Sequence, residues 1–288
     1  MKRLSIFALL AVLCIFTSSA APKSKDKAPY RQGWDQEQPL YGKVRSLVFT
    51  HHDAAQVESG KPLRKHKGNT VFAYKFNRRG HVVEEIIYNI DGSIEEKNDY
   101  KYGRKRLLTE KIIHNGDNSI REHIIYKYDK KRRVVERIWH DNEHKPKKIC
   151  LHKYDSEGRE VERVMHNADG TITGKQICKY NSQGQKSEKE IYHGNNTLHI
   201  KELYKYDSNG NLIEKRTTNG KGTLLEKELY KYDSEKHMIQ LSNYNNRGKL
   251  CARMRYKYDS KGNLIEIRAC KEGRTPPIGV IKGDIVYR

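Results

Sequence analysis

Aromatic residues recur at one fixed interval along most of this chain. They stand at positions 76, 102, 128, 154, 180, 206, 232 and 258, always 26 residues apart, and each follows a lysine. The first is Phe76 and the other seven are tyrosines. A fixed period of this length indicates a repeat architecture, in which each unit packs against its neighbours. The sequence therefore predicts eight units of 26 residues over positions 74–281.

Each unit has the pattern of a β-hairpin. In the sixth unit, strand-like residues flank the turn 207–210, which opens with Asp and closes with Gly. This pattern is typical of a type I turn followed by a left-handed glycine bulge. Because side chains alternate along a strand, we expect Tyr204, Tyr206 and Glu214 on one face and Lys205 on the other.

The composition predicts a thin structure. Hydrophobic residues make up 35% of the chain and charged residues 32%, which is low in apolar content for a two-layer core. Long charged side chains can cover apolar surface with their stems. We therefore expect an all-β fold: tandem β-hairpin repeats forming an elongated, twisted single-layer or gently coiled antiparallel sheet, similar to a solenoid, with open terminal edges.

The two ends differ from the repeats. Residues 1–20 have the pattern of a secretory signal peptide, with Lys2 and Arg3 before an apolar run and small residues before a cut after Ala20. Residues 21–39 are predicted to be a polar linker, 40–73 a divergent N-terminal capping hairpin, and 282–288 a C-terminal capping strand. We expect a protein secreted across the inner membrane, located in the periplasm, on the cell surface or outside the cell, with no transmembrane segment in the mature chain.

The charge favours acidic partners. The net charge is +21, and removing Lys2 and Arg3 with the signal peptide lowers it to +19. Such a surface attracts polyanions. The export signal argues against nucleic acid, so an anionic glycan or an envelope polymer is the expected partner.

The turn segments resemble a known family. Tyr206-Asp207-Ser208-Asn209-Gly210 and Tyr258-Asp259-Ser260-Lys261-Gly262 are similar to the YD repeats of the Rhs family, and the resemblance covers about residues 74–281. The chain resembles small exported members of the Bacteroidetes type. The resemblance implies hairpin strips, an extracellular location, and carbohydrate-binding or shell-forming roles. The unit here is longer than a typical YD repeat, and no segment after residue 281 could be an enclosed toxin.

The tyrosine column is the first candidate site. Its members share one position in every unit, so they should form a regular stripe: Tyr102, Tyr128, Tyr154, Tyr180, Tyr206, Tyr232 and Tyr258. Exposed rings in such a stripe could stack on sugars. They could equally be cross-strand pairs that hold the sheet together. Both interpretations stay open at this point.

Other chemistry is predicted to be structural. A column of glutamates recurs with the same period, but equivalent carboxylates on a strip define no distinct acid and base, so we expect no enzyme. His114, His140 and His166 share one position, and two strands per unit would place them too far apart for one metal. We expect no metal and no cofactor. Cys251 and Cys270 flank one turn and are predicted to form a disulfide.

The leading hypothesis is a non-catalytic extracellular or envelope scaffold. It would bind a glycan or envelope polymer through a basic, tyrosine-striped β-surface, by many weak equivalent contacts. The alternative is a protein–protein interaction strip, which would bind an envelope protein through its sheet edges or its face.

Overall fold

The computed structural model describes residues 43–52, 70–89, 91–270 and 279–287, and all regular elements in these ranges are β-strands. The strands are β1 (Val44–His52), β2 (Thr70–Phe76), β3 (Val82–Tyr88), β4 (Ile94–Tyr102), β5 (Leu108–Asn115), β6 (Ile120–Tyr128), β7 (Val134–His140), β8 (Pro146–Tyr154), β9 (Glu160–Asn167), β10 (Ile172–Tyr180), β11 (Lys186–His193), β12 (Leu198–Tyr206), β13 (Leu212–Asn219), β14 (Leu224–Tyr232), β15 (Met238–Asn245), β16 (Leu250–Tyr258), β17 (Leu264–Cys270) and β18 (Gly279–Tyr287). No helix in the described ranges has the length and apolar character that crossing a membrane requires.

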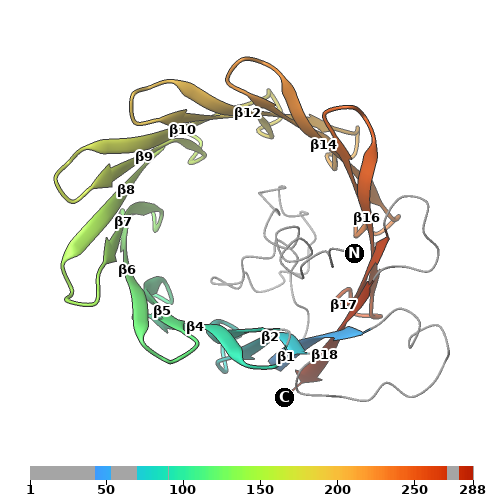
Figure 1. Ribbon diagram of the computed structural model, residues 1–288, viewed down its shortest axis with the longest axis horizontal. Coiled ribbons are helices and arrows are strands. Elements are labelled where there is room, and N and C mark those ends of the chain that lie inside the picture. Colours follow the sequence, from blue (N-terminus) through green and yellow to red (C-terminus); the bar gives the residue numbers. More distant parts are fainter. Residues whose placement is uncertain (1–42, 53–69, 90, 271–278, 288) are drawn as a thin grey trace.

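The strands form one closed sheet. Each strand pairs antiparallel with the strands before and after it in the chain, and β1 pairs with both β2 and β18. Figure 1 shows the resulting ring, an 18-stranded barrel that the chain follows in sequence order. The all-β prediction is confirmed, but the expectation of an open, elongated or solenoid-like sheet with free terminal edges is wrong.

The sheet closes into a barrel for a physical reason that cannot be read from the repeat pattern. Twisted hairpins that follow one another each turn the sheet by a similar amount, so the last strand can return to the first. Strands β1 and β18 then pair over eight positions and satisfy backbone groups that an open sheet would expose at its two edges. The 26-residue period defines one hairpin unit, but it does not define how many units are needed to close the barrel.

The predicted hairpin connection is confirmed in the turn 207–210. The Gly210 N–H donates to the Asp207 carbonyl at 3.1 Å, and the Asp207 N–H donates to the Asn211 carbonyl at 2.9 Å. Gly210 has a φ of 84°, the left-handed conformation that glycine adopts without strain. The Asp207 carboxylate also accepts the Asn211 N–H at 2.8 Å, which explains why Asp opens the turn.

One predicted face assignment is wrong. Lys205 pairs directly with Glu214, whereas Tyr206 pairs with Leu212, so Ile213 is an extra residue in β13. A bulge of this kind reverses the side-chain alternation beyond it. Glu214 therefore lies on the face of Lys205 and not on that of Tyr204.

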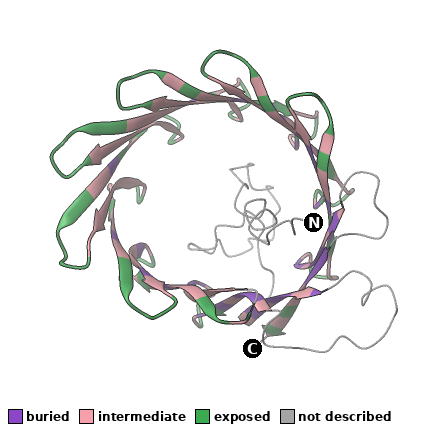
Figure 2. Ribbon diagram, in the orientation of Figure 1, coloured by how far each residue is buried: buried purple, intermediate pink, exposed green. Residues whose placement is uncertain are grey.

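The two faces of the wall differ in burial because the sheet is curved. Side chains on the concave face converge and cover one another, while those on the convex face spread apart. In β12, Glu202 and Tyr204 are buried, whereas Leu203 and Lys205 between and beyond them are exposed. We therefore assign the face of Tyr204 to the inside of the ring, called the inner face below, and that of Lys205 to the outer face. Figure 2 shows that exposure is greatest at the turns.

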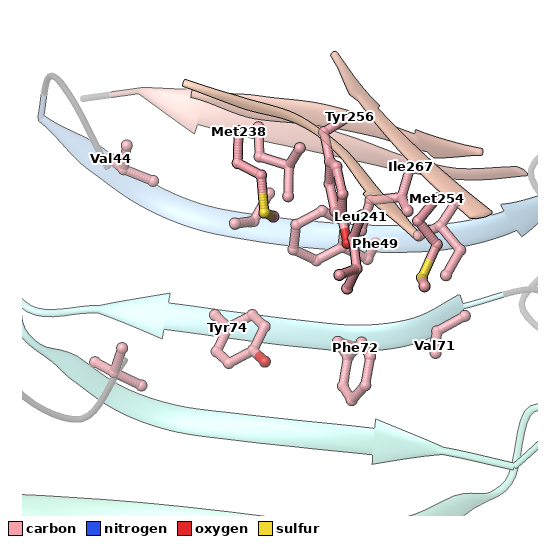
Figure 3. Close-up of a cluster of buried hydrophobic side chains, with 14 of the residues drawn as sticks. Val44, Phe49, Val71, Phe72, Tyr74, Met238, Leu241, Met254, Tyr256 and Ile267 are labelled. Atoms are coloured by element: carbon pink, nitrogen blue, oxygen red, sulfur yellow. The ribbon is translucent and has the colours of Figure 1, made fainter. Parts of the chain in front are cut away.

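The main apolar cluster lies where the barrel closes. Buried side chains of β1, β2 and β15–β17 contribute to it (Figure 3). Phe49 of β1 is buried at the seam opposite Gly283 of β18. A Cβ at Gly283 would lie 2.9 Å from the Phe49 ring, so the glycine leaves room for that ring.

Some predicted segments lie outside the described residues. The signal peptide 1–20 and the linker 21–39 do so completely, and both stay predictions. Strand β1 lies within the segment 40–73, and β2 crosses its C-terminal boundary. Strand β18 begins at Gly279, before the predicted capping strand 282–288.

Candidate functional site

The tyrosine column lies along one rim of the barrel and connects neighbouring strands. Six of its hydroxyls donate to the carbonyl 20 residues earlier, which belongs to the first residue of the preceding strand. These bonds are Tyr102 to Val82 (2.7 Å), Tyr128 to Leu108 (2.6 Å), Tyr154 to Val134 (2.7 Å), Tyr180 to Glu160 (2.8 Å), Tyr206 to Lys186 (2.8 Å) and Tyr258 to Met238 (2.8 Å). Tyr232 is half-buried against the apolar cluster.

The rings of this column are also covered. In four units, the residue that precedes an odd-numbered strand packs on the tyrosine ring of the next even-numbered strand. The pairs are His81 with Tyr102 (4.7 Å), Arg133 with Tyr154 (4.6 Å), Arg159 with Tyr180 (4.8 Å) and His237 with Tyr258 (4.7 Å). Burial raises the pKa of Tyr180 to about 12. These contacts favour the structural interpretation of the column, and a ligand-binding role stays a prediction.

The lysine and glutamate columns pair with each other on the outer face. Each ion pair joins the two strands of one hairpin: Lys75–Glu84 (2.6 Å), Lys101–Glu110 (2.9 Å), Lys127–Glu136 (2.8 Å), Lys153–Glu162 (2.6 Å), Lys179–Glu188 (2.5 Å) and Lys205–Glu214 (3.6 Å). The lysines are well exposed, so each pair contributes little to stability. Their charges are already balanced locally.

A second set of charges is buried on the inner face. Across β11–β14 the residues alternate in sign: Lys189 lies 3.1 Å from Glu202, and Lys215 lies 2.8 Å from Glu228. The Tyr230 hydroxyl donates to Glu228 at 2.8 Å. Buried charges need such partners to offset the loss of water, so this network favours one arrangement of these four strands.

The structure brings together a polar cluster that sequence reasoning missed. On β7–β9, Arg137 donates to His152 at 3.1 Å and lies 3.7 Å from the Cys150 sulfur, while His152 pairs with Glu160. Arg163 completes the cluster at 2.7 Å from Glu160. The one available signal was the Cys-x-His spacing, which places Cys150 and His152 on the same face of a strand.

The pKa values of this cluster reflect its charges. Burial alone would raise the pKa of Glu160, but the hydrogen bond from His152 and the charge of Arg163 outweigh it and lower the pKa to about 2. Burial would lower the pKa of His152, but its hydrogen bonds to Cys150 and Glu160 raise it. Burial would raise the pKa of the Cys150 thiol, yet its contacts with His152 and Arg137 lower it.

The histidines form a different group from the predicted column. His123, which was not in that column, lies between neighbours: its ring centre is 5.9 Å from that of His140 and 6.0 Å from that of His144. Among the described residues, no group of three or more His, Cys, Asp or Glu side chains is placed to hold a metal. No metal role is assigned to these side chains.

Cys251 and Cys270 are free thiols in the structure. They lie on adjacent strands, but Cys270 pairs with Arg253, so the two cysteines are diagonal neighbours. The expected disulfide stays a prediction for oxidising conditions.

Charge is distributed unevenly among the turns of the tyrosine rim. The turns of the first three hairpins hold eight cations and one carboxylate: Arg78, Arg79, Arg104, Lys105, Arg106, Lys130, Lys131 and Arg132, with Asp129. The turns of the other five hairpins hold two cations and six carboxylates: Lys236 and Lys261, with Asp155, Glu157, Asp207, Asp233, Glu235 and Asp259. The sequence alone did not single out these positions, because each turn is short and the charge gathers only when the turns become neighbours.

A closed wall of tandem tyrosine-rich hairpins defines a repeat-built β-shell. Residues 58–287 match the teneurin YD-shell family, and the chain belongs to this family. The match covers the whole of the segment 74–281 in which the sequence resembles YD repeats, and it supports the expected extracellular or envelope location. No curated protein matches the chain.

The solved structures that match this chain have low sequence identity and low TM-scores. A porin-like protein from Bacteroides uniformis is 8% identical with a TM-score of 0.45, over 86% of this chain and 100% of that one. A porin-like protein from Bacteroides vulgatus is 9% identical with a TM-score of 0.38, over 86% and 99%. In the Photorhabdus luminescens Tc holotoxin pore, the match is 10% identical with a TM-score of 0.21, over 81% of this chain but only 20% of that chain.

Proposed function

We propose that this protein is a non-catalytic scaffold of the cell envelope or the extracellular space that binds an acidic glycan or a similar envelope polymer. The observation that carries the proposal is the surplus of positive charge on a closed barrel. The chain has 57 Lys and Arg against 36 Asp and Glu. The glutamate column on the outer face is already paired with lysines, so the surplus cations elsewhere are available to an acidic partner.

A closed barrel suits this function because it holds its charges in fixed positions. Many weak contacts give a higher affinity when one rigid surface presents them together, because the protein then loses little conformational entropy on binding. The tyrosine column serves as part of the wall that holds the turns in place. Stacking of these rings on sugars would require Arg133 and Arg159 to leave the rings that they cover.

The test is a binding screen of residues 21–288 against neutral and anionic polysaccharides, with a salt titration of every ligand that binds. The proposal expects binding to anionic chains that weakens with salt but persists at about 150 mM, where interactions beyond about 8 Å are screened. Binding to neutral glycans that ignores salt would instead favour ring stacking. No binding to any polysaccharide at low salt would refute the proposal.

The alternative is a surface that binds an envelope protein. Binding of a partner protein through a sheet edge is not supported, because each described strand has a neighbour on both sides. A version that uses the outer face has one supporting observation: Leu151 is 42% exposed and Leu203 is 39% exposed there. If that version is correct, Leu151→Ser with Leu203→Ser should abolish capture of a protein partner, while polysaccharide binding is unchanged.

A further inference from the structure

We infer that the acidic polymer binds along one sector of the tyrosine rim, formed by the turns 77–80, 103–106 and 129–132. These turns are called the basic crescent below. The inference rests on the proposed function and specifies its site and its ligand class, a polysaccharide that carries regularly spaced anionic groups.

The cations of the crescent are exposed and have no ion-pair partner within the described residues. The eight side chains are Arg78, Arg79, Arg104, Lys105, Arg106, Lys130, Lys131 and Arg132, and all are exposed. The single carboxylate, Asp129, is already bound by Arg133 at 2.7 Å. In the neighbouring turn, by contrast, Arg159 pairs with both Asp155 and Glu157. The crescent is thus a block of uncompensated charge that ends abruptly at the fourth hairpin.

The backbone of the crescent supports a role beyond solubility. Arg106 and Arg132 occupy the left-handed turn position, with φ of 63° and 65°, where four of the five turns outside the crescent have glycine and the turn 233–236 has Lys236. A side chain there is strained, and glycine would be the relaxed choice. Two successive turns therefore accept strain and present an arginine. Strain that persists is often found where a residue has a function.

The spacing of the turns indicates a linear ligand. The three hairpins are consecutive in the barrel. Each turn is displaced from the next by two strand spacings, so the cations of neighbouring turns lie about 9–10 Å apart. A polysaccharide with one anionic group in each disaccharide presents charges at a comparable interval. Five of the eight cations are arginines, whose planar guanidinium can bind carboxylate or sulfate oxygens through two hydrogen bonds.

Other polyanions fit the crescent less well. A membrane-binding surface combines cations with apolar side chains that enter the lipid. The three turns contain no apolar residue other than glycine. Single-stranded nucleic acid is bound by aromatic rings beside cations, and these turns hold no aromatic residue either. The chemistry of the turns therefore favours an acidic polysaccharide.

The test replaces one basic turn with a neutral turn that the protein already uses. In the crescent variant, Arg104→Ser, Lys105→Asn and Arg106→Gly copy residues 208–210 and remove three charges. The matched control removes three exposed cations outside the crescent, by Lys147→Gln, Lys221→Asn and Arg247→Asn. Because the crescent variant also places glycine at the left-handed position, it should fold at least as well as the parent protein, which its denaturation midpoint verifies.

The probes are hyaluronate, which carries one carboxylate in each disaccharide, polygalacturonate, and vesicles of phosphatidylglycerol with phosphatidylcholine, each at about 150 mM salt. We expect the crescent variant to lose about tenfold or more in affinity for the polysaccharides, with a shallower salt dependence, and the control to lose less than about threefold. An equal loss in both variants would show that only net charge matters, which overturns the crescent while the proposed function stands. Tighter binding to vesicles than to either polysaccharide would overturn the ligand class. If the parent protein binds neither polysaccharide, the proposed function itself fails.

Discussion

The side chain of Tyr206 shows how one residue maintains the repeat. Its hydroxyl is bonded to the carbonyl of Lys186 at the start of β11, at the rim where β12 ends. The same bond recurs with the same separation of 20 residues in five other units. An insertion between the two partners would displace the hydroxyl from its acceptor. The 26-residue period is therefore kept by local geometry in each unit.

Removing this hydroxyl should weaken the barrel. In Tyr206→Phe the ring stays but the Lys186 carbonyl loses its donor, so we expect a loss of about 1 kcal/mol in the free energy of unfolding. Urea denaturation monitored by circular dichroism measures the change. Tyr192→Phe is the control, because that hydroxyl donates to the Glu190 carboxylate, a side chain of its own strand, and not to a backbone carbonyl of a neighbouring strand. Equal midpoints for Tyr206→Phe and the parent would contradict the structural role of the column.

The Glu160 and His152 pair makes stability depend on pH. The pKa of Glu160 is lowered to about 2 in the folded protein, so its contribution is present above about pH 4.5 and is lost as the pH falls toward 2. The pKa of His152 is raised, so its contribution is complete below pH 6.5 and is lost as the pH rises through the folded value. Both contributions are therefore present between about pH 4.5 and 6.5.

Denaturation midpoints measured from pH 3 to pH 8 test this pair. We expect the parent protein to lose more stability below pH 4.5 than Glu160→Gln, which has no carboxylate to protonate. Parallel pH profiles for the two proteins would show that the pair has no influence on folding.

At the scale of the element, the turn chemistry decides where each hairpin reverses. Gly222 closes the turn between β13 and β14 with a φ of 83°, and a Cβ at this residue would have no atom within 4 Å. Lys236 occupies the same conformation in another turn, with a φ of 67°. The first position is relaxed and the second is strained, although both turns make the same pair of backbone hydrogen bonds.

Substitutions at these two turns should act in opposite directions. Gly222→Ala should destabilise the protein by about 1 kcal/mol through backbone conformation alone, since nothing blocks the new side chain. Lys236→Gly should stabilise it by up to about 1 kcal/mol. Thermal denaturation of both variants measures the difference. A change of the same sign in both would mean that the left-handed conformation is not the determining factor.

At the scale of the whole molecule, the decisive contact joins the first strand to the last. Val48 of β1 pairs with Asp284 of β18, although more than 230 residues separate them in the chain. The sheet has no described edge as a result, which removes the surface on which edge-to-edge aggregation begins.

A designed disulfide tests the closure. With Val48→Cys and Asp284→Cys, oxidation should give a cross-link within one monomer, found as the joined peptide by mass spectrometry. In the control pair, Val48→Cys with Leu203→Cys, the two positions lie on strands that are not neighbours, and no cross-link should form. Failure of the first pair to cross-link, or cross-linking only between molecules, would favour an open sheet.

The sequence by itself determined the repeat unit, its hairpin form and its turn chemistry. These depend on local interactions, such as an Asp that accepts the N–H of a residue four positions later, so they are visible as a pattern. The sequence did not determine the closure of the barrel. The rotation from one hairpin to the next is a property of the packed sheet, and small differences in this rotation accumulate over 18 strands. Nor did it determine which charges gather, since Arg79, Arg104 and Lys130 become neighbours only when the chain brings successive turns to one rim. The face of Glu214 was missed for a related reason: a single bulge shifts the alternation, and only the paired strands reveal it.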